Sequence, residues 1–200
     1  QTCALPIYLS SSDTVPLNNV GTFNNAGTFT NSGTTAHTVS LTAFNNSGQV
    51  NVGAGTLTLN SPGAADTGKL DVAGGATLVL SSNRTLGAGS DVTGAGQVNF
   101  TSGTVNVNDG YGIAGTGVTL INGGTLNLST SAGTLSLANP LTVSSGALTG
   151  TNAITPLKVI PANGFNYTGT IIDVAVGGTG NQKFLMTTAG LWAWGKDRKS

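Results

Sequence analysis

A short phrase recurs along this 200-residue chain: a glycine, a small or polar residue, and then an apolar–polar–apolar run. Strict alternation over a few residues predicts a β-strand with one buried face, and the Gly, Asn and Ser residues between the runs predict turns. Glycine at these corners supplies the positive φ that tight turns need. The phrase therefore predicts an all-β fold of many short strands. Its copies are GQVNV (48–52), GTLTLN (55–60), GKLDV (68–72), ATLVL (76–80), GQVNF (96–100), GTVNVN (103–108), GTLNLS (124–129) and GTLSLA (133–138).

The strands also repeat at a longer interval, in three columns of apolar residues. Three columns that repeat at the same interval indicate a coil with three faces, in which each face contributes one strand per turn. We therefore predict a parallel β-helix, a three-faced β-solenoid with about 20–21 residues per coil, and a right-handed one because parallel crossovers nearly always are. The first column is Leu57, Leu78, Val98 and Val118; the second is Val50, Leu70, Val92 and Ile113; the third is Leu86, then Val105 and Val107, then Leu126 and Leu128, then Leu148.

Composition narrows the possible functions. Charged residues make up 7% of the chain and glutamate is absent, so the strong helix formers are scarce. A hydrophobic content of 38% with zero net charge argues against disorder, and the same charge balance excludes nucleic-acid binding through a basic surface. One histidine and one cysteine leave little material for catalysis or metal binding. We therefore expect no cofactor and no enzyme activity.

Asparagines recur at the same interval as the apolar columns. In stacked coils the members of each pair would lie about 4.8 Å apart, close enough for their side-chain amides to form ladders. The alternative is that these asparagines serve only as turn residues. The pairs are Asn24 with Asn45, Asn25 with Asn46, and Asn106 with Asn127.

The chain is predicted to have four segments. Residues 1–7 and 197–200 resemble translated sequencing-adapter DNA, so we expect both true termini to lie outside the chain and draw no redox argument from Cys3. Residues 8–154 carry the β-helix repeats. In residues 155–196 prolines and aromatic residues replace the Gly-Thr phrase. There we predict an irregular or degenerate β continuation, either a cap or a frame error, with one strand at 170–176.

Three of the repeats carry a resemblance to a family. The runs FNNAGTFTNSGT (23–34), FNNSGQVNVGAGTLTLN (44–60) and GAGQVNFTSGTVNVN (94–108) resemble repeats of very large bacterial surface proteins. These are the autotransporter-passenger and filamentous-adhesin-like β-strand-repeat proteins, and the resemblance covers about residues 20–150. It implies a β-helical passenger or stalk segment, exported and displayed on the cell surface, often for adhesion.

Few residues qualify as candidates for a site. Asp71 and Asp91 are twenty residues apart, so a constant period would place them in one outward column, where a cation could bind between them or the pKa of one carboxyl would rise. Lys69 and Arg84 are the cations expected near this pair. The alternative is two solvated surface aspartates. We expect His37 to be an exposed loop residue, because no partner residues surround it in the sequence, and Asp109 to be a turn residue.

Two functions follow from this pattern. The first is a structural and adhesive segment of an exported bacterial surface protein, a stiff stalk that contacts surface glycans, extracellular matrix or other copies of its parent by multivalent polar contacts. Its location would be extracellular, at the outer membrane of a bacterial cell, with any membrane anchor in other parts of the parent chain. The alternative is a carbohydrate-active β-helical enzyme, a lyase or hydrolase, whose groove is weakly marked or missing.

Overall fold

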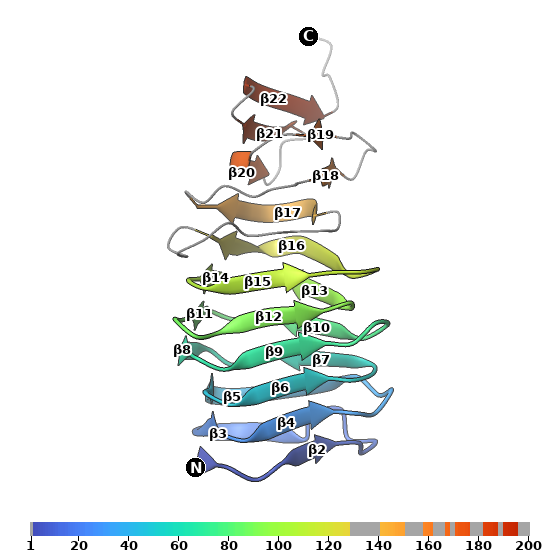
Figure 1. Ribbon diagram of the computed structural model, residues 1–200, viewed down its shortest axis with the longest axis vertical. Helices are drawn as coiled ribbons and strands as arrows, with labels where there is room; N and C mark the ends of the chain where they lie inside the picture. Colours follow the sequence, from blue (N-terminus) through green and yellow to red (C-terminus); the bar gives the residue numbers. More distant parts are fainter. Residues whose placement is uncertain are drawn as a thin grey trace.

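The computed structural model describes residues 2–128, 141–150, 158–161, 167–168, 171–176, 182–187 and 190–195. Parallel strands form a right-handed β-solenoid of about six turns, and the described residues contain no helix. The chain enters at the base of Figure 1 and rises coil by coil, so strands distant in sequence lie side by side. The predicted fold class is confirmed.

The first face of the solenoid is a six-stranded parallel sheet, seen from the front in Figure 1. Apolar residues alternate with outward polar ones in most of its strands, as a sheet with one solvated face requires. From the bottom upward its strands are β2 (Ile7–Leu9), β4 (Thr28–Asn31), β6 (Gln49–Val52), β9 (Lys69–Val72), β12 (Asp91–Gly94) and β15 (Gly110–Ile113).

The second and third faces belong to one larger sheet. Long strands bend across both faces at the two ends of the solenoid, namely β3 (Leu17–Asn25), β5 (His37–Asn46), β16 (Val118–Asn127) and β17 (Leu141–Thr149). In the middle coils, a corner between the second and third faces divides this stretch of the chain into two short strands, one on each face. The second face then holds β7 (Thr56–Leu59), β10 (Thr77–Leu80) and β13 (Gln97–Phe100), and the third holds β8 (Gly63–Asp66), β11 (Arg84–Leu86) and β14 (Thr104–Val107). The short β1 (Thr2–Cys3) pairs with β3.

Beyond β17 the pairing changes from parallel to antiparallel. Strand β18 (Lys158–Pro161) still pairs with β17 in parallel, but β19 (Tyr167–Thr168) runs antiparallel to it. Strands β20 (Ile171–Val176), β21 (Gln182–Thr187) and β22 (Gly190–Gly195) then form an antiparallel series on β17. The predicted strand at 170–176 is confirmed as β20. Residues 197–200, for which an adapter origin was predicted, lie outside the described residues.

The predicted columns hold through the middle coils and fail where the coil length changes. Leu57, Leu78 and Val98 are register partners, but the next partner is Thr119, so the prediction of Val118 in this column was wrong. On the first face Val92 pairs with Tyr111. Partners on this face lie between 19 residues apart, for Val92 and Tyr111, and 22 apart, for Leu70 and Val92. The corners absorb these length differences, because loops tolerate insertions that strands do not.

The same variation corrects the second column at its upper end. Ile113 was predicted to follow Val92, but its register partner is Gly94. The third column is confirmed, because Leu86 pairs with Val107, and Val105 pairs with Leu126, which pairs with Leu148. Phe23 with Phe44 and Phe29 with Val50 are also register partners.

Inward side chains fill the solenoid with a continuous apolar core. Near its base Phe23 stacks on Phe44 with ring centroids 5.6 Å apart, and Phe29 meets Phe44 edge to face at 5.4 Å. Burial of each large apolar side chain contributes about 1.5–3 kcal/mol. The largest fully buried residues are Phe29, Phe44, Phe100, Leu57, Leu59, Leu70, Leu78, Leu80, Leu86, Ile113, Ile121 and Leu126.

Glycines at the corners serve two purposes. Gly55 and Gly103 adopt φ of 60° and 70°, which confirms the expectation that corner glycines supply positive φ. Gly48 and Gly68 do not have positive φ. There the reason is contact between coils: a Cβ atom at Gly68 would overlap the carbonyl oxygen of Gly48, and one at Gly48 would overlap that of Gly27. Both positions therefore require glycine, because the backbones of neighbouring coils lie too close together there for a side chain.

Candidate functional site

The two aspartates proposed as a pair do not share a column. Asp91 is the register partner of Lys69, and Asp71 is the partner of Thr93, whose hydroxyl donates a hydrogen bond of 2.9 Å to Asp71 Oδ1. The 22-residue coil between β9 and β12 displaces the carboxylates by two residues along the strands. The prediction of adjacent carboxylates is therefore wrong. The predicted neighbour Lys69 does lie on this face, whereas Arg84 belongs to β11 on the third face.

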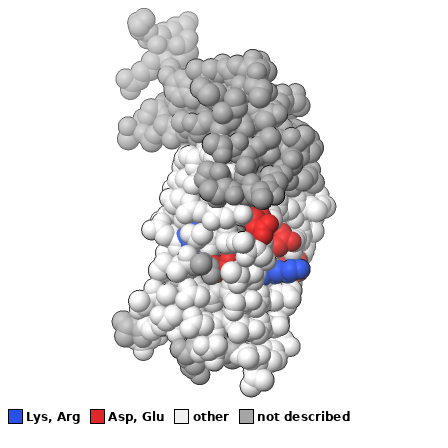
Figure 2. Space-filling view, turned by 60° about the vertical axis from the view of Figure 1, so that its left-hand side comes forward, with Lys and Arg blue, Asp and Glu red and all other residues white. Residues whose placement is uncertain are grey.

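Charged side chains are few on the visible surface. Figure 2 shows them gathered over the middle coils, with the rest of the described surface in that view uncharged. Asp109 lies in the bend before β15, where its carboxylate accepts a 2.6 Å hydrogen bond from the backbone amide of Gly89, as expected of a turn residue. The described residues contain no group of three or more His, Cys, Asp or Glu side chains placed to bind a metal.

His37 is buried, so the prediction of an exposed loop residue is wrong. It is the first residue of β5 and lies level with Leu57 on the next coil. Its Nδ1 is 2.5 Å from Asn31 Oδ1 and its Nε2 is 3.0 Å from the carbonyl oxygen of Ser11. The available signal was alternation, because His37 stands two residues before the inward Val39 and shares its side of the strand.

The predicted asparagine ladders form. Asn45 donates to Asn24 over 2.9 Å, and Asn127 donates to Asn106 over 2.8 Å, both on the outer side of the third face. Asn25, which is buried, donates to Asn46 Oδ1 over 2.8 Å and to the backbone of Gln49. These amides therefore link neighbouring coils in addition to the backbone ladder.

A buried ion pair lies beneath the third face, and sequence reasoning missed it. Arg84 enters the solenoid from β11 and pairs with Asp66 of β8, with side chains 1% and 0% exposed. Arg84 Nη1 also donates to the carbonyl oxygen of Phe44 over 3.2 Å, and Nη2 donates to that of Ser61 over 2.9 Å. The guanidinium lies 5.8 Å from the centre of the Phe44 ring. Every strong interaction of this cation is thus made inside the protein.

The position of Arg84 requires a glycine on the coil below. Gly63 is its register partner, and a Cβ atom there would overlap the guanidinium. Burial raises the pKa of Asp66 above its ordinary value of 3.8, against the opposing effects of Arg84 and of the backbone amide of Asn46, which donates to Asp66 Oδ1. Asp66 therefore binds a proton more tightly in the fold than in the unfolded chain, and its side chain is fully buried.

A second buried polar contact lies higher in the solenoid. The hydroxyl of Tyr111 is 2.8 Å from that of Thr119, and burial raises the pKa of Tyr111 well above its usual range. Thr119 occupies the place in the first column that was predicted for Val118. This contact explains how a threonine is accommodated in the core, because each hydroxyl satisfies the other.

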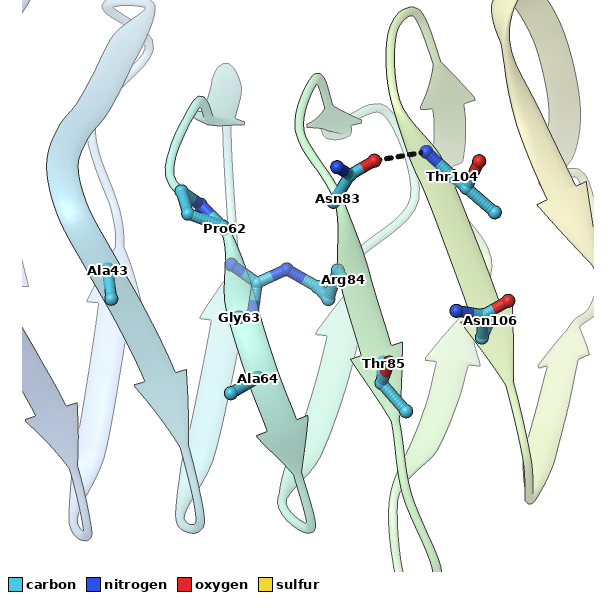
Figure 3. Close-up of a pocket in the computed structure, with 9 residues that line it drawn as sticks. All are labelled: Ala43, Pro62, Gly63, Ala64, Asn83, Arg84, Thr85, Thr104 and Asn106. Carbon is cyan, nitrogen blue, oxygen red and sulfur yellow. Dashed lines mark hydrogen bonds between the residues drawn. The ribbon is translucent and has the colours of Figure 1, made fainter.

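A shallow groove of about 550 Å³ runs across the outer side of the third face, above the ion pair. Figure 3 shows that its lining comes from successive coils, from β5 through β8 and β11 to β14. Its lining residues are Ala43, Pro62, Gly63, Ala64, Asn83, Arg84, Thr85, Thr104 and Asn106. This groove could not be predicted from the sequence, because its small outward residues carry no distinctive signal.

No protein-family model matches the chain, and no curated protein or solved structure matches it either. Among the described residues there is no helix long and apolar enough to cross a membrane. The assignment of the fold therefore rests on the repeats and on the observed strand register.

Proposed function

We propose that this chain is a structural and adhesive segment, a stiff rod that presents polar faces for many weak contacts outside a bacterial cell. The observation that carries the proposal is the parallel pairing of strands from coil to coil, which runs on the first face from Ile7 to Ile113 and on the second face from Leu17 to Val143. A solenoid of this kind holds the outward side chains of successive coils one strand spacing apart, so weak contacts along it add up through avidity.

The charged groups support a structural function over a catalytic one. The buried pair Asp66 and Arg84 is saturated by internal partners, and the surface carboxylates Asp71 and Asp91 are offset from each other. A β-helical hydrolase or lyase would need acid and base groups that converge on a substrate. The resemblance of residues 20–150 to repeats of bacterial surface proteins supports the location outside the cell.

The proposal can be tested with beads that carry the full chain at high or low density, washed over a film of mucin glycoprotein under flow. An adhesive segment retains the high-density beads and loses the low-density ones, because avidity depends on the number of contacts. Failure to retain either kind of bead would overturn the adhesive function. Release of reducing ends from polysaccharides by the soluble chain would instead support the enzyme alternative.

A further inference from the structure

The groove on the third face has a polar half made by two neighbouring coils. Thr85 on β11 and Asn106 on β14 are register partners, so they lie one strand spacing apart, about 4.8 Å. Beside them Asn83, just before β11, and Thr104 of β14 are linked by a 2.9 Å hydrogen bond from the Thr104 backbone amide to Asn83 Oδ1. The four side chains thus form a small lattice of hydroxyl and amide groups on the outer side of the sheet.

Much of the hydrogen-bonding capacity of this lattice is directed to solvent. The side-chain oxygens of Asn83 and Asn106 are occupied, the latter by Asn127. Within the described part of the chain, the side-chain nitrogens of these two asparagines and the hydroxyls of Thr85 and Thr104 have no hydrogen-bond partner. They offer two amide donors and two hydroxyls that both donate and accept.

The other half of the groove is apolar and small. Ala43 of β5, Pro62 and Ala64 line it, and Gly63 leaves only backbone in its floor. A ligand that fits both halves must carry hydroxyl or amide groups along one side and C–H groups along the other. A sugar ring has both, because its hydroxyls point outward from an edge while its ring faces expose C–H groups.

The lining carries one charged group, Arg84, and its side chain is 1% exposed and paired with Asp66. An anionic polymer therefore gains no counter-ion in the groove and loses hydration there. We propose that this groove binds a single strand of an uncharged polysaccharide that lies across the coils. The proposal rests on the adhesive function proposed above and names its ligand class and binding residues.

The volume of the groove, about 550 Å³, falls within the usual range for small-molecule sites. Its described lining residues include no aromatic ring on which a sugar could stack, and the groove is shallow. One groove is therefore expected to bind weakly, and a surface densely covered with copies supplies the retention that a single copy does not.

The test is affinity electrophoresis of the full chain in native gels that contain dextran, hydroxyethylcellulose or polygalacturonate. The wild type should be retarded by at least one of the two neutral polymers and should run at its normal rate in polygalacturonate. Thr85→Val with Thr104→Val removes both hydroxyls but keeps β-branched side chains of the same shape. This double variant should lose at least two thirds of the retardation.

Thr58→Val is the matched control, because Thr58 is a half-buried outward residue of β7 on the second face, away from the groove. It should be retarded as strongly as the wild type, and circular dichroism should show that all variants keep the β-fold. The proposal is overturned by a lack of retardation in both neutral gels, by equal retardation in polygalacturonate, or by an unchanged double variant. If any of these occurs while the dense beads still adhere to mucin, the adhesive function stands and only the groove is refuted.

Discussion

The lower and upper parts of the solenoid have the same backbone architecture but different interiors. Among the described side chains, the core of residues 2–86 contains seven buried polar or charged residues, whereas that of residues 87–128 contains two, Ser90 and Thr119. Both parts keep parallel register on all three faces. The comparison indicates that alternation and the backbone ladder are enough to build a coil. The seven polar residues of the lower part are Asn25, Asn31, His37, Asn46, Ser61, Asp66 and Arg84.

The polar contacts of the lower part add specificity that apolar columns lack. A Leu or Val column packs almost as well after a shift of two residues, but a hydrogen bond joins particular atoms. Asn25 with Asn46 and Asp66 with Arg84 each connect two coils in this way. We therefore expect mutations to have different consequences in the two parts, and the predictions below test this from the largest effect to the smallest.

The largest loss is expected for Arg84→Ala. It leaves the Asp66 carboxylate buried without its cation and should lower the free energy of unfolding by about 3–5 kcal/mol, measured by urea denaturation. Val105→Ala, at the register partner one coil higher, removes only apolar contacts and should cost less. Arg84→Met combined with Asp66→Asn keeps an acceptor for the Asn46 amide and should recover most of the loss. Equal losses for Arg84→Ala and Val105→Ala would contradict the distinction between the two parts.

Gly68→Ala tests a feature that the two parts share, the close stacking of corner backbone. The new Cβ atom would overlap the carbonyl oxygen of Gly48, so stability should fall by about 3 kcal/mol. Gly117→Ala, in the upper part, should behave similarly because its Cβ would meet the carbonyl oxygen of Gly96. Gly74→Ala is the control, since its nearest neighbour would be 3.9 Å away. A loss at Gly74 as large as at Gly68 would refute the stacking argument.

Thr119→Val tests the main polar contact of the upper part. It removes the partner of the buried Tyr111 hydroxyl and should lower the midpoint of urea unfolding, at a cost of about 1–3 kcal/mol. Adding Tyr111→Phe to this variant makes the pair fully apolar and should restore stability to near that of the wild type. If the double variant is less stable than Thr119→Val, the upper part depends on its polar contact as the lower part does.

The smallest expected effect is a gain in the lower part. Within the described residues, Asn25 Oδ1 is buried without a hydrogen-bond partner, and the register partner of Asn25 on the coil below is Cys3. Cys3→Asn would extend the ladder by one amide and should add about 1 kcal/mol. Cys3→Leu is the comparison, because it offers no donor. A thermal midpoint that does not differ between these two variants would show that the ladder ends at Asn25.

The sequence was sufficient for the fold because its signal is repeated many times. Leu57, Leu78 and Val98 could be aligned from spacing alone, and the asparagine ladders followed from the same spacing. The next alignment failed because residues 118–121 read Val-Thr-Leu-Ile, in which either alternate set can face the core. The Tyr111 hydroxyl favours the set that includes Thr119, and that contact comes from a different face.

The candidate sites were less predictable because they depend on coil lengths and on contacts between faces. Asp71 and Asp91 were placed together by an assumed constant period, which the 22-residue coil between Leu70 and Val92 breaks. Arg84 was expected near Asp71 and Asp91 on the outward side, but arginine can be fully buried when it has a partner. Its partner Asp66 lies eighteen residues earlier, next to an unremarkable turn, so composition and spacing gave no indication of the pair.

The bond between Arg84 and Asp66 also limits how a protein of this kind can lengthen by duplication. Gly63 on one coil makes room for the guanidinium of Arg84 on the next coil. Neither coil is therefore a module that could be copied without the other. A tandem copy that joins the two in a new order would leave a lone charge in the interior. Duplication is therefore tolerated here only in units that carry both members, whereas the coils above, which hold no buried charge among the described residues, can be copied one at a time.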